Sequence, residues 1–423
     1  MNVKRQKIHD KIFTICCLGL VFFMPIFEKI LPSIIFLMVL NWLVEGRFKR
    51  IPAIFRERHR TLTLSFIAIY ILYLIGMLYS KNMKYGFFDL QIKLSLFLFP
   101  LIFATVNTNF KIQKLISNVF KSFIAGCVTG TLILLGIALY SYFGSGNPMV
   151  FFYTSFSRSI HPSYLSMYLN LAVSILAYHL IRKERQSIKK IRTLLFVLAL
   201  YLSFVIILLS SKAGIFSLLF LFLIITIYII VINKQVWKGL IFFFLVLMTF
   251  YAGYNFLPAI AARFKRAESV LAEQKKSSPE TMESNSERLV VWKAGIEVIR
   301  ENPVFGVGTG DVKDALLSEY QKENRLLVYN MRLNAHNQYL QTYIALGIFG
   351  ALMLVIYMVV PGWFAIRRIH FIYFSFLVVF AFNILVESML EVQAGVIYYA
   401  FFNALLFFGW NKLPNQQGDP ERK

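Results

Sequence analysis

Long apolar runs constrain the fold of this chain more than any other feature of its sequence. Hydrophobic residues occupy 58% of its 423 positions and charged residues only 15%, and the mean hydropathy is +0.64. A soluble domain does not need that much apolar surface, and a run of about 20 apolar residues has the length at which a helix crosses a bilayer. We therefore predict an all-α, polytopic membrane protein.

The apolar runs divide the chain into spans and connecting segments. About twelve transmembrane helices are expected, near residues 12–28, 31–45, 61–79, 89–106, 118–143, 162–181, 193–209, 215–232, 239–257, 337–360, 371–387 and 395–410. The first nine lie within 1–257, a large and partly helical loop occupies 258–335, the last three lie within 336–410, and 411–423 form a tail.

Basic residues orient the predicted bundle. The chain has 44 Lys and Arg against 21 Asp and Glu, a formal charge of +23. The segments on one side of the spans, including both ends of the chain, are rich in Lys and Arg, whereas the short loops on the other side carry few. Since basic loops stay in the cytoplasm, both termini should be cytoplasmic and the large loop should face outward. Basic residues between apolar spans also indicate contact with anionic membrane lipids and argue against a nucleic-acid partner.

The sequence predicts no metal or cofactor. Cys16, Cys17 and Cys127 lie inside apolar runs, where neither a disulfide framework nor a zinc site is expected. Asp311 and Asp314 are too isolated to indicate a site for a divalent metal ion.

The outer loop is expected to contain a helix. Residues 284–287 form a capping box, and the helix that starts there should end before Pro303. Arg288 and Trp292 are four residues apart, so they share one face of this helix. The glycine-rich stretch 303–310 lacks the strand–helix context of a dinucleotide site and predicts a turn with closely approaching backbone.

His336 stands where the outer loop returns to the membrane. If Asn334 caps the next helix, the imidazole lies in its first turn, where the helix dipole favours a neutral ring and a nearby anionic ligand. The alternative is an interfacial histidine that only anchors the helix end. The polar neighbours Asn334, Asn337 and Gln338 favour a functional site.

Arg288 is the second candidate. An arginine on an outer helix, beside Trp292, can offer its planar fork to phosphate oxygens. The alternative is a snorkelling or surface arginine, which the spacing does not exclude.

Three other outer residues are candidates for substrate binding. Arg158 and His161 lie in the loop before the sixth span, next to a proline that starts the helix. Ordinary interfacial polarity explains this pair equally well. Lys212 is the lone cation of a tight turn.

Lys93 lies inside a predicted span, where a charged side chain is a functional candidate by default. Asp89 is one helical turn away, so a structural ion pair is nearly as good an explanation. Glu387 and Glu391 flank the last outer turn and could neutralise the outer cations.

A cluster of outer cations suits an anionic amphiphile, such as a lipid-linked phosphate or diphosphate. No nucleotide pool exists outside the cytoplasm to drive synthesis, but a lipid-linked donor arrives with its diphosphate leaving group already in place. Arginines can stabilise the departing charge in place of a metal.

The order of these motifs resembles a known family. Arg288, Trp292 and the stretch 302–308 precede the sequence His336-Asn-Gln-Tyr-Leu, and a large outer loop precedes the tenth span. In this order they resemble the O-antigen ligase/polymerase family of bacterial envelope glycosyltransferases. The resemblance covers most of the chain and is tightest over about residues 288–350.

The resemblance implies a GT-C-like fold and a periplasmic active face in the bacterial inner membrane. Members of that family act on glycans carried by undecaprenyl diphosphate: ligases transfer the glycan to a lipid A-core acceptor, and polymerases to another lipid-linked repeat. The ligases are thought to be metal-independent. By this resemblance His336 is a base toward the acceptor hydroxyl or a group that positions it, and Arg288 contacts the diphosphate.

Lys212 departs from the family pattern. The family's other outer arginine commonly follows a serine in a Ser-Arg-Gly-like turn, and here the turn reads Ser211-Lys212-Ala213-Gly214. Lysine keeps the charge but loses the bidentate geometry. Arg158 is a candidate to compensate.

Other functions remain open at this point. A polymerase or a protein O-oligosaccharyltransferase would use the same donor; the single large outer loop favours a ligase, since polymerases often carry two. A transporter fits the number of spans. However, transporters tend to show two similar halves with charges at mid-membrane, whereas the ionisable residues here concentrate at one face.

Overall fold

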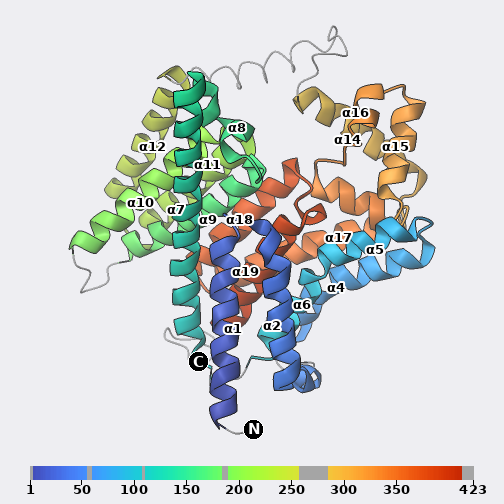
Figure 1. Cartoon of the computed structure of the whole chain (residues 1–423), viewed down its shortest axis with the longest axis horizontal. Helices are drawn as coiled ribbons and strands as arrows, with labels where there is room; N and C mark the ends of the chain where they lie inside the picture. Colours follow the sequence, from blue (N-terminus) through green and yellow to red (C-terminus); the bar gives the residue numbers. More distant parts are fainter. Residues whose placement is uncertain (1–2, 55–59, 107–109, 183–188, 257–283, 412–423) are drawn as a thin grey trace.

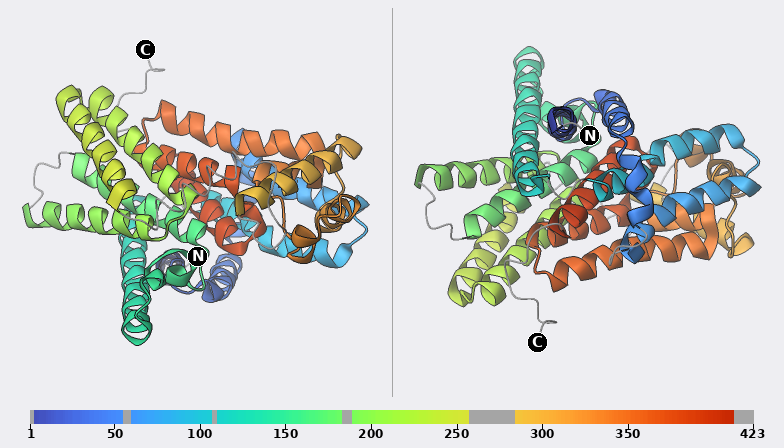
Figure 2. Two further views of the ribbon diagram at one scale, coloured as in Figure 1. Left: turned by 90° about the horizontal axis from the view of Figure 1, so that it is seen from above. Right: turned by 90° about the horizontal axis from the view of Figure 1, so that it is seen from below.

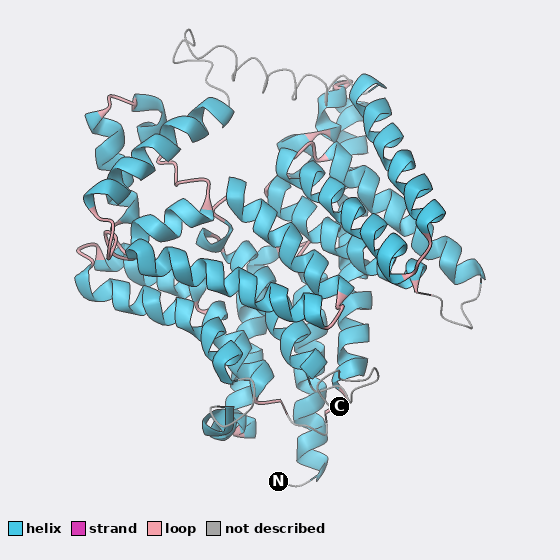
Figure 3. Cartoon of the chain, turned by 180° about the vertical axis from the view of Figure 1, so that it is seen from behind, coloured by secondary structure: helices cyan, strands magenta, loops and turns pink. Residues whose placement is uncertain are grey.

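A computed structural model describes residues 3–54, 60–106, 110–182, 189–256 and 284–411. Within these ranges the chain forms helices and no strands, so the predicted all-α class is confirmed (Figure 3). The α-helices are α1 (Val3–Phe23), α2 (Leu31–Glu45), α3 (Ile51–Ile54), α4 (Arg60–Gly76), α5 (Met83–Lys93), α6 (Ser95–Ala104), α7 (Ile112–Ser145), α8 (Tyr153–Ser157), α9 (Pro162–Ile181), α10 (Lys189–Leu208), α11 (Lys212–Ile227), α12 (Val236–Phe256), α14 (Ser284–Glu301), α15 (Val312–Lys322), α16 (Leu326–Asn330), α17 (Gln338–Arg367), α18 (Phe371–Val386) and α19 (Gln393–Asn411).

Each predicted apolar run coincides with a helix or with consecutive helices, as expected for a multi-pass membrane protein. Among the described residues, six helical segments are long and apolar enough to cross a membrane. They are Met83–Ala104, Ile112–Ser145, Pro162–Ile181, Lys189–Leu208, Lys212–Ile232 and Gln338–Arg367. The remaining apolar helices are shorter or less apolar, so the number of about twelve crossings stays a prediction.

The helix α9 lies at the centre of the bundle. In its apolar window 78% of the residues are buried, against 22% in the neighbouring α10. It packs against α10, α11 and α18, and α18 in turn packs against α17 and α19. Aromatic rings fill this interior: the ring centroids of Phe380 and Tyr399 lie 4.3 Å apart. Close contacts between rings of this kind hold the central helices in register.

The helices α14, α15 and α16 form a small unit at one end of the molecule, opposite the start of α1 (Figure 1). This arrangement agrees with an outer loop and a cytoplasmic N-terminus on opposite sides of the membrane, although the assignment of the sides remains a prediction. Viewed from above and below, α4, α5 and α17 extend toward the end that carries α15, whereas α10, α11 and α12 lie at the opposite end and α1 and α7 lie on one side between the two ends (Figure 2). The first part of the predicted loop, residues 257–283, lies outside the described residues.

The helix α17 is interrupted where the glycine-rich segment after α14 crosses it. Gly347 has φ 62° and ψ −154° inside α17. At this break the Val307 amide donates to the Ile344 carbonyl at 2.8 Å, and the Ile348 amide donates to the Pro303 carbonyl at 3.1 Å. The crossing segment therefore satisfies backbone groups that the interruption leaves free, which is a requirement at membrane depth. The predicted close approach of this backbone is confirmed.

The same segment is also tied to the turn between α4 and α5. The Asp311 carboxylate accepts hydrogen bonds from the backbone amides of Lys81 and Asn82, each at 2.7 Å. The Thr309 hydroxyl donates to the Tyr73 carbonyl at 2.7 Å. These contacts fix the unit of α14, α15 and α16, which we call the outer helical unit, to α4 and to the turn that precedes α5.

Candidate active site

A single carboxylate, Glu387, joins the two principal candidates. Arg288 Nη2 donates to Glu387 Oε1 at 2.5 Å, and His336 Nδ1 lies 3.0 Å from Glu387 Oε2. The exposed fractions of the side chains are 9% for Glu387, 21% for Arg288 and 29% for His336. The carboxylate is thus enclosed while both of its partners keep an exposed edge. We call these three residues the Glu387 cluster.

The helix α14 places Arg288 and Trp292 as their spacing predicts. The helix starts at Ser284, where the capping box was expected, and Trp292 lies one turn after Arg288. Trp292 Nε1 donates to the carbonyl of Ala335 at 3.0 Å, and Ala335 is fully buried. Trp292 therefore holds the backbone immediately before His336, while Arg288 reaches the carboxylate that His336 also contacts.

The expected position of His336 relative to α17 is wrong. The N-cap is Asn337 and not Asn334, because the Asn337 side chain accepts from the amides of the second and third helical residues. His336 precedes the helix with φ 44°, and its amide donates to Asn334 Oδ1 at 3.0 Å. The imidazole is therefore oriented mainly by Glu387 and by a left-handed backbone, a conformation that costs about 1 kcal/mol or more. It does not lie within the first turn.

The segment 387–391 pairs with the start of α17 nearly residue by residue. Beyond the His336–Glu387 contact, the Asn337 amide donates to Ser388 Oγ at 3.2 Å. The buried Gln338 side chain accepts from the Leu390 amide at 2.7 Å and donates to Glu391 at 3.1 Å. These contacts fix Glu387 relative to His336.

Lys93 contacts the last residue of this segment, Glu391, and its side chain is fully buried. Its ammonium forms ion pairs with Asp89 and, at 3.0 Å, with Glu391, and it lies 4.7 Å from the centroid of the Tyr73 ring. The structure thus supports the structural ion pair with Asp89. Lys93 is enclosed, so it does not belong to the open outer surface with the other candidate cations.

His161 and Lys212 lie at neighbouring helix starts. His161 caps α9, its Nδ1 accepting from the Ser163 amide at 3.3 Å, and the Ser163 hydroxyl lies 3.3 Å from that of Ser211. Ser211 caps α11, whose first residue is Lys212. The charge of His161 also acts on Glu387, where it lowers the pKa. The two predicted outer loops therefore meet beside the Glu387 cluster.

Arg158 is directed elsewhere. It is exposed, and its Nη2 donates to Ser141 Oγ on α7 at 2.9 Å. The structure thus joins Arg158 to α7 and shows no contact with Glu387.

The pKa values of Glu387 and Glu287, the two acidic groups next to Arg288, are shifted in opposite directions. Burial alone would raise the pKa of Glu387, but the hydrogen bond from His336 and the positive charges of Arg288 and His336 outweigh it, so the pKa is lowered. Burial raises the pKa of Glu287, and the charges of His336 and Arg288 only partly offset this effect. Glu387 is therefore an ionised carboxylate at neutral pH.

This geometry allows His336 to accept a proton and Arg288 to donate a hydrogen bond. A carboxylate bonded to imidazole Nδ1 orients the ring and stabilises its protonated form, so that Nε2 can take up a proton. Arg288 Nε is buried and has no hydrogen-bond partner among the described residues. The side chain as a whole is 21% exposed, so the accessible part of the guanidinium can donate to an incoming oxygen atom. In the described parts of the chain, no group of three or more His, Cys, Asp or Glu residues could hold a metal ion.

Comparison with known proteins identifies the segment that carries this geometry. Residues 194–355 match a family model described as O-antigen ligase. This match covers less than half of the chain and supports the O-antigen ligase family. No curated protein sequence matches the chain. The matched segment runs from α10 into α17 and includes Lys212, Arg288, Trp292 and His336, in agreement with the family predicted from the order of the motifs.

Glu387 lies after the matched O-antigen ligase segment. The sequence shows Glu387 and Glu391 as acidic residues that could neutralise the candidate cations; in the structure Glu387 pairs with Arg288, and Glu391 pairs with the buried Lys93. It does not show that one carboxylate serves Arg288 and His336 together, because the three residues come from distant parts of the chain. The sequence signal that could have indicated Glu387 as their partner is that acidic residues are scarce near the outer ends of the predicted spans.

Proposed function

We propose that this protein is an O-antigen ligase-like transferase. It would move a glycan from undecaprenyl diphosphate to a lipid A-core or similar envelope acceptor, at the periplasmic face of the bacterial inner membrane. The family match supports a ligase- or polymerase-like activity in general. The observation that carries the finer proposal is the Glu387 carboxylate bonded to both His336 and Arg288 where the outer loop meets α17.

In this proposal His336 is the general base. The acceptor hydroxyl oxygen attacks the anomeric carbon of the lipid-linked glycan, and its proton passes to Nε2 of His336. Glu387 stabilises the imidazolium that results, since it already contacts Nδ1. General-base catalysis of this kind contributes about 10²- to 10⁴-fold in rate.

Arg288 stabilises the leaving group. As the bond between the anomeric carbon and the phosphate oxygen breaks, its electron pair remains on the diphosphate. Arg288 can hold a phosphate oxygen through the exposed part of its guanidinium while Nη2 stays on Glu387. A guanidinium held by a carboxylate is preorganised for this contact. No metal is required in this proposal.

We assign binding roles to the neighbouring candidates. His161 and Lys212, at adjacent helix starts beside the Glu387 cluster, would bind donor phosphate oxygens. Asn337 and Trp292 would position the His336 backbone. Arg158 would contact substrate only after leaving Ser141.

Substitution of His336 and Arg288 by alanine tests these roles. We expect both His336→Ala and Arg288→Ala to reduce glycan transfer by at least about 10²-fold while leaving membrane insertion and abundance intact. Transfer would be measured with purified protein, a lipid-diphosphate glycan and an acceptor. Full activity in either variant would remove that residue from the mechanism.

The acceptor distinguishes a ligase from its closest alternatives. A panel containing lipid A-core, a second lipid-linked repeat and an acceptor protein would be offered to the same preparation. Product on lipid A-core supports the ligase proposal, whereas product on a second repeat or on protein indicates a polymerase or a protein O-oligosaccharyltransferase. Reversible loss of transfer on chelation would contradict the metal-independent mechanism.

A further inference from the structure

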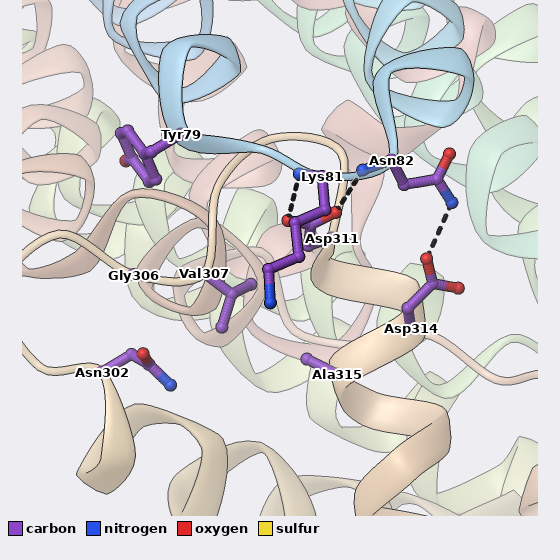
Figure 4. Close-up of a pocket in the computed structure, with 9 residues that line it drawn as sticks. All are labelled: Tyr79, Lys81, Asn82, Asn302, Gly306, Val307, Asp311, Asp314 and Ala315. Carbon is purple, nitrogen blue, oxygen red and sulfur yellow. Dashed lines mark hydrogen bonds between the residues drawn. The ribbon is translucent and has the colours of Figure 1, made fainter.

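A cavity lies where the segment that joins α14 to α15 meets the turn between α4 and α5. Its volume is about 660 Å³, within the range of small-molecule sites. It lies between the α4–α5 turn and the segment that joins α14 to α15 (Figure 4). Its lining is Tyr79, Lys81, Asn82, Asn302, Gly306, Val307, Asp311, Asp314 and Ala315. No member of the Glu387 cluster lines it, so it is distinct from the site described above.

The walls of this cavity are held in place by contacts between distant segments. Asp311 accepts from two backbone amides of the α4–α5 turn, and Asp314 accepts from Asn82 Nδ2 at 2.7 Å. A Cβ atom on Gly310 would lie 2.3 Å from the Asn82 carbonyl oxygen. The two backbone segments are therefore so close that only glycine fits at this position. The cavity is therefore preformed, and a ligand would bind without ordering a loop.

The cavity offers both donors and acceptors of hydrogen bonds. The Lys81 side chain extends into its centre, and the Asn302 amide points into it from the opposite wall (Figure 4). Tyr79 contributes a 40% exposed ring at the edge. The carboxylates of Asp311 and Asp314 disfavour a strongly anionic ligand. Sugar hydroxyls both donate and accept, so a neutral or weakly charged saccharide matches this lining.

The cavity also opens beside exposed apolar side chains. Leu78, next to Tyr79, is 85% exposed, and Phe305, next to Gly306, is 64% exposed. Exposed apolar side chains of this kind contact lipid in a membrane protein. A saccharide that reaches the cavity is thus presented at the level of the membrane surface, as the head of a lipid-anchored molecule is.

We propose that this cavity binds a sugar residue of a lipid-anchored glycan, at a distance from the bond that reacts. Lys81 and Asn302 hold the sugar hydroxyls, and Tyr79 borders one face of the ring. This inference rests on the proposed function for its substrate class. Two sources share the chemistry: the glycan of the lipid-diphosphate donor and the glycan of the acceptor lipid.

Kinetics of Lys81→Ala and Asn302→Ala test the proposal, with Lys84→Ala as the matched control. Lys84 is an exposed lysine three residues away that does not line the cavity. One arm varies the donor at saturating acceptor, and the other varies the acceptor at saturating donor. We expect KM to rise about tenfold in one arm for both cavity variants, with kcat unchanged, because each removes a hydrogen bond to bound sugar. Lys84→Ala should match the wild type. The arm that responds identifies the source.

A binding measurement separates this proposal from the proposed function. Oligosaccharides released from donor and acceptor lipids would be tested by saturation-transfer NMR with the full-length protein. Binding to the wild type that is lost in Lys81→Ala and Asn302→Ala supports the cavity even if no transfer is observed. Transfer by the wild type with unchanged KM and unchanged binding in both variants would overturn the proposal while leaving the transferase intact.

Discussion

Glu387 is the residue on which the candidate site depends most. It contacts an arginine from α14 and a histidine from the start of α17. Its removal would leave Arg288 without its ion pair and the imidazole without orientation. Carboxylates that orient metal-ligating histidines contribute about 10- to 100-fold to activity, and we expect an effect of the same order for the carboxylate that orients His336.

We therefore predict that Glu387→Gln lowers kcat for glycan transfer by about 10²-fold. The amide keeps the shape of the side chain but cannot stabilise an imidazolium or pair with a guanidinium. Glu297→Gln is the matched control, because Glu297 forms an exposed ion pair on the same helix as Arg288. Equal kcat values for Glu387→Gln and the wild type would show that the carboxylate has no part in the reaction.

The lowered pKa of Glu387 gives a second prediction at the residue scale. A carboxylate whose pKa is lower in the folded protein than in the unfolded chain stabilises the fold at pH values above its unfolded pKa. This stability is lost as the pH falls through the pKa of the folded state. The melting temperature of the wild type should therefore exceed that of Glu387→Gln at neutral pH. The margin should shrink as the pH falls below about 4. A margin that stays undiminished below about pH 4 would contradict the ion-pair assignment.

At the scale of elements, the break in α17 is a structural requirement of the outer loop. A Cβ atom on Gly347 would lie 2.1 Å from the Val304 carbonyl oxygen, and its φ of 62° disfavours other residues. We predict that Gly347→Ala lowers the free energy of unfolding by about 3 kcal/mol or more. Gly362→Ala in the same helix is the control, since a Cβ there meets no atom within 4 Å, and it should cause no loss. Thermal unfolding in detergent measures both, and equal stability of the two variants would refute the role of the break.

Helices could be predicted from this sequence because apolar runs and caps are local signals. The start of α14 and the shared face of Arg288 and Trp292 follow from spacing alone. The break at Gly347 does not, since a glycine in an apolar run is ordinary and its conformation depends on the backbone of the distant segment from Pro303 to Val307. Asn334 and Asn337 are equally good N-cap residues by sequence, and the structure shows that Asn337 is the one that caps α17.

At the scale of the whole molecule, the structure brings most of the candidate site residues together from distant parts of the chain. The Glu387 cluster and the starts of α9 and α11 lie together, and Lys93 neutralises the acidic residues beneath them. The partners of Glu387 are 99 and 51 residues away in sequence, which explains why residue types could be predicted and their pairing could not. The segment that matches the family model ends before Glu387, so the end of α18 supplies the carboxylate that joins Arg288 and His336.

The measurement that tests the central claim most directly is product analysis with protein in liposomes. The wild type would be given a labelled glycan on undecaprenyl diphosphate together with lipid A-core. We predict that the label appears in a new glycosidic bond to the acceptor, with release of undecaprenyl diphosphate, and that His336→Ala and Glu387→Gln lose most of this product. Movement of the labelled lipid across the bilayer without a new bond would contradict the account and would identify a transporter.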